Sequence, residues 1–187
     1  MIQEAIVSTL NKQGQLHLAP MGIHFIENDC IILPFKPSAT LDNIVATRSA
    51  IINYCDDVRI FAGCLTGRRH WSTKPAEKII GYVLNNALSH QEVTLIKIEN
   101  HPLRPKLFCQ IQHSVNHSPF RGFNRAQFAV IEAAILISRL NYLPFSEIEM
   151  QINYLRIMVE KTASAVEWEA WGWLMAVIHQ YKQQENL

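Results

Sequence analysis

The sequence contains few of the features that mark the common enzyme classes. Its 187 residues include no CxxC pair, no HExxH or HxH pattern, and no GxSxG, GxGxxG or Walker A motif. The four cysteines are scattered, and three of them stand in apolar runs, which is typical of buried, reduced thiols rather than of a zinc site. These absences disfavour a metal site and exclude the most familiar hydrolases, nucleoside triphosphatases and Rossmann dehydrogenases.

Strong charge and long apolar runs are absent as well. The formal net charge of +1 gives no reason to expect a nucleic-acid partner. The run AVIEAAILI is about half as long as a membrane-spanning helix needs to be, and it contains Glu132. The N-terminal MIQEAIVSTL lacks the basic and long apolar segments of a secretory signal. We therefore expect a cytoplasmic protein without a membrane partner, and its 49% hydrophobic residues suffice for a sizeable core.

The first 118 residues show the pattern of β-strands joined by short turns. Residues 15–27 alternate with the period of two that a strand requires, and Pro20 predicts a break or bulge there. Residues 56–65 fit either a helical turn or a strand edge, and the polar residues 66–80 predict a loop. Further strands are predicted over residues 4–11, 30–35, 50–55, 92–100 and 105–115. Six or seven strands with hairpin links predict a closed or half-closed antiparallel barrel.

The remainder of the chain has helical periodicity. One helix is predicted to begin at Asn124, a natural N-cap, and a second at Ser146, with Glu149 completing a capping box. A third is predicted over about residues 166–183. Such helices cannot bury their apolar stripes alone, so they must pack on one another, on the barrel or on a second subunit. We therefore divide the chain into a barrel domain, residues 1–118, and a helical C-terminal region, residues 119–187.

The segment PFKPSATLDNIV, residues 34–45, joins an apolar strand to a short predicted helix. A helix N-terminus attracts anions because its first amide N–H groups have no partner within the helix. Four polar side chains could surround a phosphate there: Lys36, Ser38, Thr40 and Asn43. The alternative is ordinary capping, with Thr40 as the N-cap that bonds the amide of Asn43, while Asp42 would repel an anion. The residues alone leave both interpretations open.

Several spaced segments resemble an uncharacterised family of FMN-binding split-barrel proteins, labelled domain of unknown function 447. GFNRAQFAVIEAAILISRL is the most specific segment, and APMG together with PFK is moderately specific. EAIVSTLN, NYCDDVRIFA and LRIMVEKT also match, so the resemblance spans roughly residues 2–162. It implies a mainly β fold with α (α+β), namely a split antiparallel β-barrel of the flavin-reductase type followed by a roughly three-helix C-terminal region. It also implies a homodimer with one FMN near each subunit interface.

The resemblance assigns roles to particular residues. It implies that the flavin phosphate lies at the strand-to-helix connection, on Lys36, Ser38, Thr40 and Asn43. It also implies that the flavin ring lies along the strand that contains Met21 and Gly22, where the missing side chain of Gly22 would let the ring approach the backbone. A further contact from the next strand is assigned to Asn53, and the 66–80 loop could overhang the flavin.

An FMN-dependent oxidoreductase is the activity that the resemblance favours, with NADH, NADPH or another small molecule as electron donor. No catalytic side chain is identified, because flavin chemistry does not require a protein nucleophile. Two alternatives stay open: a flavin-binding or interaction module without turnover, and a flavin-dependent step in pterin-linked one-carbon metabolism. The second rests only on the occurrence of relatives in methanogens and methylotrophs.

Overall fold

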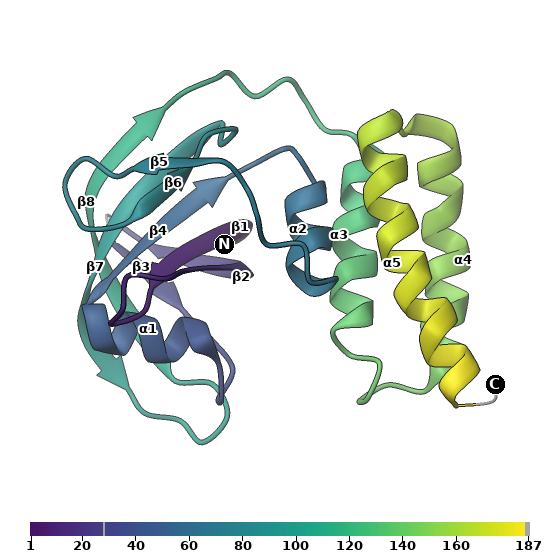
Figure 1. Cartoon of the computed structure of the whole chain (residues 1–187), viewed down its shortest axis with the longest axis horizontal. Helices are drawn as coiled ribbons and strands as arrows, with labels where there is room; N and C mark the ends of the chain where they lie inside the picture. The colour runs from purple at the N-terminus through teal and green to yellow at the C-terminus, as the bar shows by residue number, and fades with distance from the viewer. Residues whose placement is uncertain (28, 186–187) are drawn as a thin grey trace. The chain divides into compact units, whose positions relative to one another are not determined.

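The computed structural model describes residues 1–27 and 29–185, and these form two compact units. The barrel unit comprises Met1–Cys55 and His70–Phe120. The helical unit comprises Asp56–Arg69 and the chain from Arg121 onward. Figure 1 shows the strands gathered in the first unit and four of the five helices in the second. Residues 56–69 thus belong with the C-terminal helices, although they precede most of the second half of the barrel in sequence.

Six antiparallel strands close the barrel in the order β1-β2-β3-β8-β7-β4. The strands are β1 (Ile2–Leu10), β2 (Leu16–Ile26), β3 (Asp29–Ile32), β4 (Ser49–Tyr54), β7 (Ser89–Glu99) and β8 (Lys106–Asn116). The ring closes through β1 and β4, where Val7 is opposite Ile52. The antiparallel barrel predicted from the sequence is confirmed, and so is the class of a mainly β fold with α.

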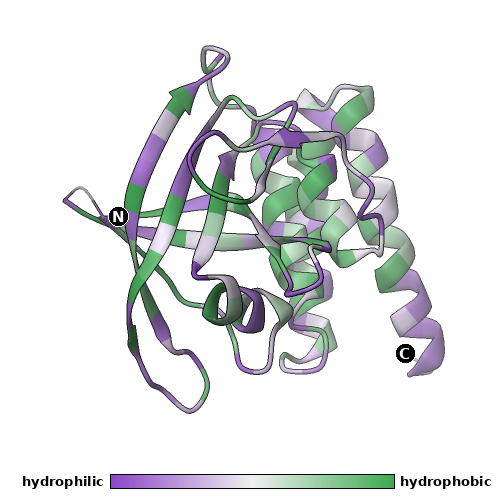
Figure 2. Cartoon of the chain, turned by 60° about the vertical axis from the view of Figure 1, so that its left-hand side comes forward, coloured by the Kyte–Doolittle hydropathy of each residue, from purple (hydrophilic) through white to green (hydrophobic). Residues whose placement is uncertain are grey.

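Alternation of side chains along the strands builds the barrel interior. Figure 2 shows hydrophobic and hydrophilic residues following one another along the arrows. Val7, Ile23, Ile32, Ile52 and Leu107 point inward and are completely buried. Burying a side chain of this size contributes roughly 1.5–3 kcal/mol, so a cluster of this kind supplies a stable frame for a site on its rim.

Strand β2 runs through Pro20 without a break, contrary to the sequence prediction. Ile6 pairs with Pro20 in an unshifted register with β1 that extends from Ile2 to Leu10. On its other side β2 pairs with β3 only from Ile23 onward. Because β2 has a free edge at Pro20, the missing amide hydrogen of proline removes no ladder hydrogen bond there.

The segment predicted as a loop over residues 66–80 contains part of a hairpin, formed by β5 (Thr73–Pro75) and β6 (Tyr82–Leu84). Buried polar side chains of the barrel hold this hairpin by its backbone. Ser8 donates a 2.7 Å hydrogen bond to the carbonyl oxygen of Tyr82, and the amide of Leu84 donates a 2.9 Å bond to Asn53. The prediction failed because three-residue strands held by distant side chains leave no periodic signal in the sequence.

The helical unit consists of α2 (Arg59–Leu65), α3 (Arg125–Ile137), α4 (Phe145–Thr162) and α5 (Ala165–Gln184). The structure resolves the ambiguity over residues 56–65 in favour of a helix. All four helices contribute residues to one hydrophobic core, whose fully buried members include Ala62, Val130, Ile148 and Leu174. None of the helices in the described part of the chain has the length and apolar character required to cross a bilayer.

The helix caps differ in part from those predicted. Asn124 caps α3 as expected, by accepting a 2.7 Å hydrogen bond from the amide of Ala126. Ser146 is not a cap, because α4 already begins at Phe145 after Pro144 and has no side-chain cap. The capping box lies instead at the start of α5, between Ser164 and Glu167. Proline fixes a backbone angle suitable for entering a helix, which explains the earlier start of α4.

Candidate functional site

The turn between β3 and α1 (Ala39–Thr47) is the first part of the candidate site. Ser38 is the N-cap, with extended backbone and a hydroxyl that accepts a 3.3 Å hydrogen bond from the amide of Leu41. The helix therefore begins before Thr40, and the prediction of Thr40 as N-cap is wrong. Serine and threonine have similar capping propensities, so the sequence did not distinguish Ser38 from Thr40.

The first turn of α1 presents unpaired donors. Within the described chain the backbone amides of Ser38, Ala39 and Thr40 make no hydrogen bond, whereas the amide of Asp42 donates to the carbonyl oxygen of Ser38 at 3.1 Å. Unpaired amides at a helix N-terminus carry partial positive charge, and this arrangement suits an oxyanion. The charged side chain of Lys36 adjoins the turn and is exposed.

Thr40 is the most unusual residue of this turn. Its side chain is 1% exposed, yet its hydroxyl has no hydrogen-bond partner among the described residues. Leaving a buried hydroxyl unpaired costs about 1–3 kcal/mol, so such groups are rare in a well-packed protein. Nearby, the amide group of Asn43 donates a 3.0 Å hydrogen bond to the hydroxyl of Thr9, which fixes α1 to β1. Asn43 thus has a structural role that was not predicted from the sequence.

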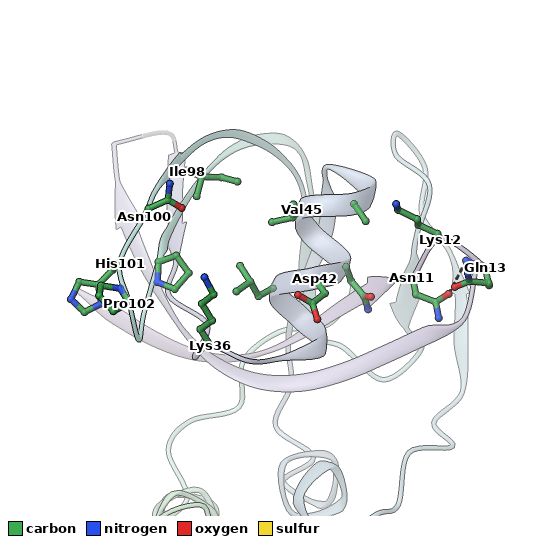
Figure 3. Close-up of a pocket in the computed structure, with 14 residues that line it drawn as sticks. Asn11, Lys12, Gln13, Lys36, Asp42, Val45, Ile98, Asn100, His101 and Pro102 are labelled. Atoms are coloured by element: carbon green, nitrogen blue, oxygen red, sulfur yellow. Dashed lines mark hydrogen bonds between the residues drawn. The ribbon is translucent and has the colours of Figure 1, made fainter.

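A pocket of about 1120 Å³ adjoins the outer face of α1 (Figure 3). The turn after β1, the start of α1 and the β7–β8 connection form its walls. Three of its residues are basic or can become so, and one is acidic: Lys12, Lys36, His101 and Asp42. Side-chain amides of Asn11, Gln13, Asn43 and Asn100 complete the polar lining. The remaining lining residues are apolar, so the pocket suits a ligand that combines an apolar part with a polar part that carries negative charge.

The β7–β8 connection contributes residues that sequence reasoning missed. The amides of Leu103 and Arg104 donate hydrogen bonds of 3.2 and 3.1 Å to Nδ1 of His101. Because Nδ1 accepts twice, a neutral His101 must carry its proton on Nε2, which becomes a donor. The guanidinium of Arg104 lies 4.6 Å from the centre of the Phe35 ring. In the sequence HPLR indicated only a short link between strands, so nothing there pointed to these contacts.

The other predicted flavin contacts lie outside this pocket. Met21 and Gly22 lie on β2, opposite Ala5 and Glu4 of β1. The space next to Gly22 is filled, because a Cβ atom there would come within 2.9 Å of the Ile2 side chain. The missing side chain of Gly22 is therefore used by strand packing, and a flavin ring could use that space only if Ile2 moved.

Asn53 is completely buried and fully engaged within the protein. Its amide group donates to the carbonyl oxygen of Ile6 and to the hydroxyl of Ser8, both at 3.0 Å, and its oxygen accepts from Leu84. Both hydrogens of its amide group are therefore used within the barrel, and its complete burial separates its oxygen from a ligand at the surface. The structure thus brings Lys36, Ser38, Thr40 and Asn43 together at one turn, and it places Met21, Gly22 and Asn53 elsewhere on the barrel.

Comparison with known proteins relates this architecture to flavoproteins. The FMN-bound protein MM1853 from Methanosarcina mazei matches with a TM-score of 0.82 over 94% of each chain, at 18% identity. The 2-nitrobenzoate 2-nitroreductase of Pseudomonas fluorescens matches at 0.53 and 20% identity, over 61% of this chain and 64% of its own. An NADH:FAD oxidoreductase of Streptomyces globisporus also matches at 0.53, with 8% identity over 62% and 76% of the two chains. These likenesses show the fold of flavin reductases.

A search of curated proteins finds no match. The family described as protein of unknown function (DUF447) matches in two consecutive parts. Its N-terminal domain covers residues 3–118, which form strands and α1 with the inserted helix α2, and its second part covers residues 124–176, which form helices. The matched residues make up most of the chain and include the turn before α1. The chain therefore belongs to the DUF447 family.

Proposed function

We propose that the protein binds FMN and holds the flavin phosphate at the N-terminus of α1. The observation that carries this proposal is the buried hydroxyl of Thr40, which lacks a partner beside three unpaired backbone amides. The oxygens of a phosphate could accept from these donors, whereas an apolar ligand would satisfy none. The similar fold of an FMN-bound member of the family supports the same ligand.

The charges around the turn fit a phosphate with one exception. Lys36 supplies a positive charge, and Nε2 of His101, whose Nδ1 accepts from two amides, adds a donor at the adjoining pocket. Asp42 opposes an anion, but its side chain is exposed, so water and salt screen its charge. The helix N-terminus and Lys36 together outweigh this repulsion in the proposed site.

The ring of the flavin is proposed to lie along β2, near Met21 and Gly22. This placement requires the Ile2 side chain to turn away, and Ile2 is 57% exposed near the start of the chain, so it has room to do so. We leave Asn53 outside the proposed contacts because its three hydrogen bonds already hold β1, β4 and β6 together.

We further propose that the protein is an oxidoreductase. Bound FMN would supply two-electron redox chemistry, and the chain would bind and orient it at α1 and β2. A nicotinamide donor is proposed because one protein of similar fold is an NADH:FAD oxidoreductase. A binding module that keeps its flavin without turnover is the alternative, and the experiment below distinguishes the two.

The test uses the purified full-length chain incubated with FMN and then desalted. The proposal expects stoichiometric flavin absorbance after desalting, followed by loss of that absorbance when NADH or NADPH is added without oxygen. Retention of oxidised flavin in the presence of both donors would support a binding module instead. A chain that retains no FMN would remove the whole proposal.

The proposal extends to a homodimer, since the flavin site of such barrels is expected near a subunit interface. Light scattering coupled to size exclusion should give twice the chain mass of 21.4 kDa. A monomer that binds FMN tightly would contradict the proposed dimer but not the proposed flavin site.

A further inference from the structure

A chain of three titratable side chains lies on β7 and just beyond β8, apart from the α1 turn. His90 and Glu92 are two residues apart on β7, so both side chains point to the same face of the sheet. His117 follows the end of β8, and its amide donates a 2.8 Å hydrogen bond to the carbonyl oxygen of Leu88. The three side chains are joined in the order Glu92, His90, His117.

Glu92 is the inner end of this chain and is completely buried. Its carboxylate accepts hydrogen bonds of 2.7, 2.7 and 2.9 Å from the amides of Glu77, Lys78 and Ile79, in the β5–β6 connection. Burial acts to raise the pKa of this carboxyl group. The hydrogen bonds from the three amides and from His90 lower the pKa by more than burial raises it, so the net pKa lies below its ordinary value. Glu92 is therefore a fixed negative charge at neutral pH.

The fixed charge determines which ring nitrogens of the histidines carry hydrogen. Nε2 of His90 lies 3.4 Å from Oε1 of Glu92, and a carboxylate can only accept, so His90 carries its hydrogen on Nε2. In the neutral form of this ring, Nδ1 of His90 is then an acceptor. It lies 2.8 Å from Nε2 of His117, which must donate. The two rings are nearly parallel, at 7°, with centroids 5.0 Å apart.

The outer nitrogen of His117 is consequently left with a lone pair. His117 is partly exposed, and its Nδ1 has no hydrogen-bond partner among the residues that the structure describes. Lys74 on β5 and Glu77 in the β5–β6 connection both act electrostatically on the ring. His113 on β8 also faces the cluster: its ring centroid is 6.3 Å from that of His90, and its Nε2 lies 3.2 Å from Glu77 without a well-aligned hydrogen bond.

The geometry points to an acid–base relay, in which Nδ1 of His117 exchanges a proton with a small molecule and Glu92 stabilises the resulting positive charge through His90. The molecule would carry an ionisable O–H, N–H or S–H group. When His117 takes this proton, the hydrogen on its Nε2 can shift to Nδ1 of His90, so that the charge spreads over both rings. Lys74 would stabilise the anion left on the molecule.

The environment keeps the outer base neutral at physiological pH. Desolvation is the main cause that lowers the pKa of His117 below its ordinary value, Lys74 and His90 lower it further, and Glu77 opposes them. A neutral imidazole next to a buried carboxylate–imidazole pair has the organisation of a general base. This inference does not depend on FMN binding, because none of its residues belongs to the α1 turn.

Nitrogen-15 NMR of the histidine rings in the full-length chain tests the relay. At neutral pH we expect the Nε2–H tautomer for both His90 and His117. When His117 takes up its proton on acidification, the ring signals of His90 should change with it, because a hydrogen bond joins the two rings. An Nδ1–H tautomer at His117, or a titration of His117 that leaves His90 unchanged, would overturn the inference.

Two variants separate the relay from a merely structural cluster. Glu92→Gln should lower the pH at which the pair takes up its proton by about one unit or more, because a nearby negative charge is lost. This variant also weakens the hydrogen bonds that the amides of residues 77–79 donate to Glu92. Lys74→Met is a surface change that keeps those hydrogen bonds, and it should shift the proton uptake to higher pH. Unchanged titration in both variants would refute the electrostatic coupling.

Chemical modification tests the open nitrogen directly. Diethyl pyrocarbonate acylates neutral imidazole nitrogens that are accessible, so His117 should be modified and the buried His90 should be protected. Modification at His117 should slow as the pH is lowered through its titration. Absence of modification at His117 at neutral pH would contradict an available Nδ1 lone pair.

Discussion

The amide of Lys36 donates a 2.9 Å hydrogen bond to the carbonyl oxygen of Leu103. This bond joins the turn before α1 to the β7–β8 connection, although 67 positions separate the two residues in the sequence (103 minus 36). Arg104 adds a 3.2 Å bond to the carbonyl oxygen of Leu33. The proposed phosphate turn is therefore supported from a distant part of the barrel, and changes in the β7–β8 connection should affect it.

His101 provides a test of that support. His101→Ala removes the acceptor of two backbone amides and should lower the free energy of unfolding by roughly 1–2 kcal/mol, because each such bond contributes about 0.5–1.5 kcal/mol. His101→Asn is the matched control, since an asparagine oxygen can accept from amides two and three residues ahead. Urea unfolding should show a larger loss of stability for His101→Ala than for His101→Asn. Equal losses would show that Nδ1 is not the relevant acceptor.

Thr40→Val tests whether the hydroxyl of Thr40 binds a ligand or another group of the protein. Valine has nearly the shape of threonine but no hydroxyl, so it removes a buried group that lacks a partner. The apo protein should therefore be unchanged or more stable by up to about 1 kcal/mol, whereas FMN affinity should fall about tenfold. Thermal unfolding and flavin titration measure the two effects. A loss of apo stability would indicate a hydrogen bond for Thr40 within the protein itself.

Glu92 should make the stability of the barrel unit depend on pH. Its pKa in the folded state lies below the ordinary value of 4.5, so its contribution is complete above pH 4.5 and is lost as the pH falls through the lower folded value. Glu92→Gln should cost about 2 kcal/mol at neutral pH, because charge-assisted hydrogen bonds are replaced by weaker ones. The variant should also show less acid sensitivity. Glu99→Gln, on the exposed end of the same strand, should change stability little.

The caps of the C-terminal helices offer a further test. Ser164→Ala should destabilise the protein by about 1 kcal/mol, because Ser164 and Glu167 form a complete capping box at α5. Ser146→Ala should be almost neutral, since Ser146 lies inside α4 and is exposed. Chemical denaturation of the two variants side by side provides the measurement. A larger loss for Ser146→Ala would contradict the start of α4 at Phe145.

Local patterns in the sequence were sufficient for the barrel strands and for most helices, but not for the short strands β5 and β6. Alternation predicted β2, the strands predicted over residues 92–100 and 105–115 correspond to β7 and β8, and the apolar stripe after Asn124 predicted α3. The exceptions depend on tertiary context. Pro20 fits within β2 only because β3 begins to pair beyond it, and α2 was ambiguous because its helix is only seven residues long.

The candidate site was predictable only in its local part. Ser38, Thr40 and Lys36 stand within five residues of one another, so their grouping could be inferred from the sequence. The hydrogen bond from the amide of Lys36 to Leu103, and the contact between His90 and His117, join residues that are far apart in the sequence. Such long-range hydrogen bonds leave no spacing pattern, which is why neither was predicted.

Comparison of FMN with riboflavin tests the central claim most directly, because the two flavins differ by the phosphate alone. Isothermal titration of the wild-type chain should show FMN binding at least about tenfold more tightly than riboflavin, in line with several charge-assisted hydrogen bonds. In a Lys36→Ala, Ser38→Ala, Thr40→Ala triple variant, the two affinities should become similar. Thr47→Ala, at the other end of α1, should retain the preference. Equal affinities in the wild type, or an unchanged preference in the triple variant, would contradict phosphate binding at α1.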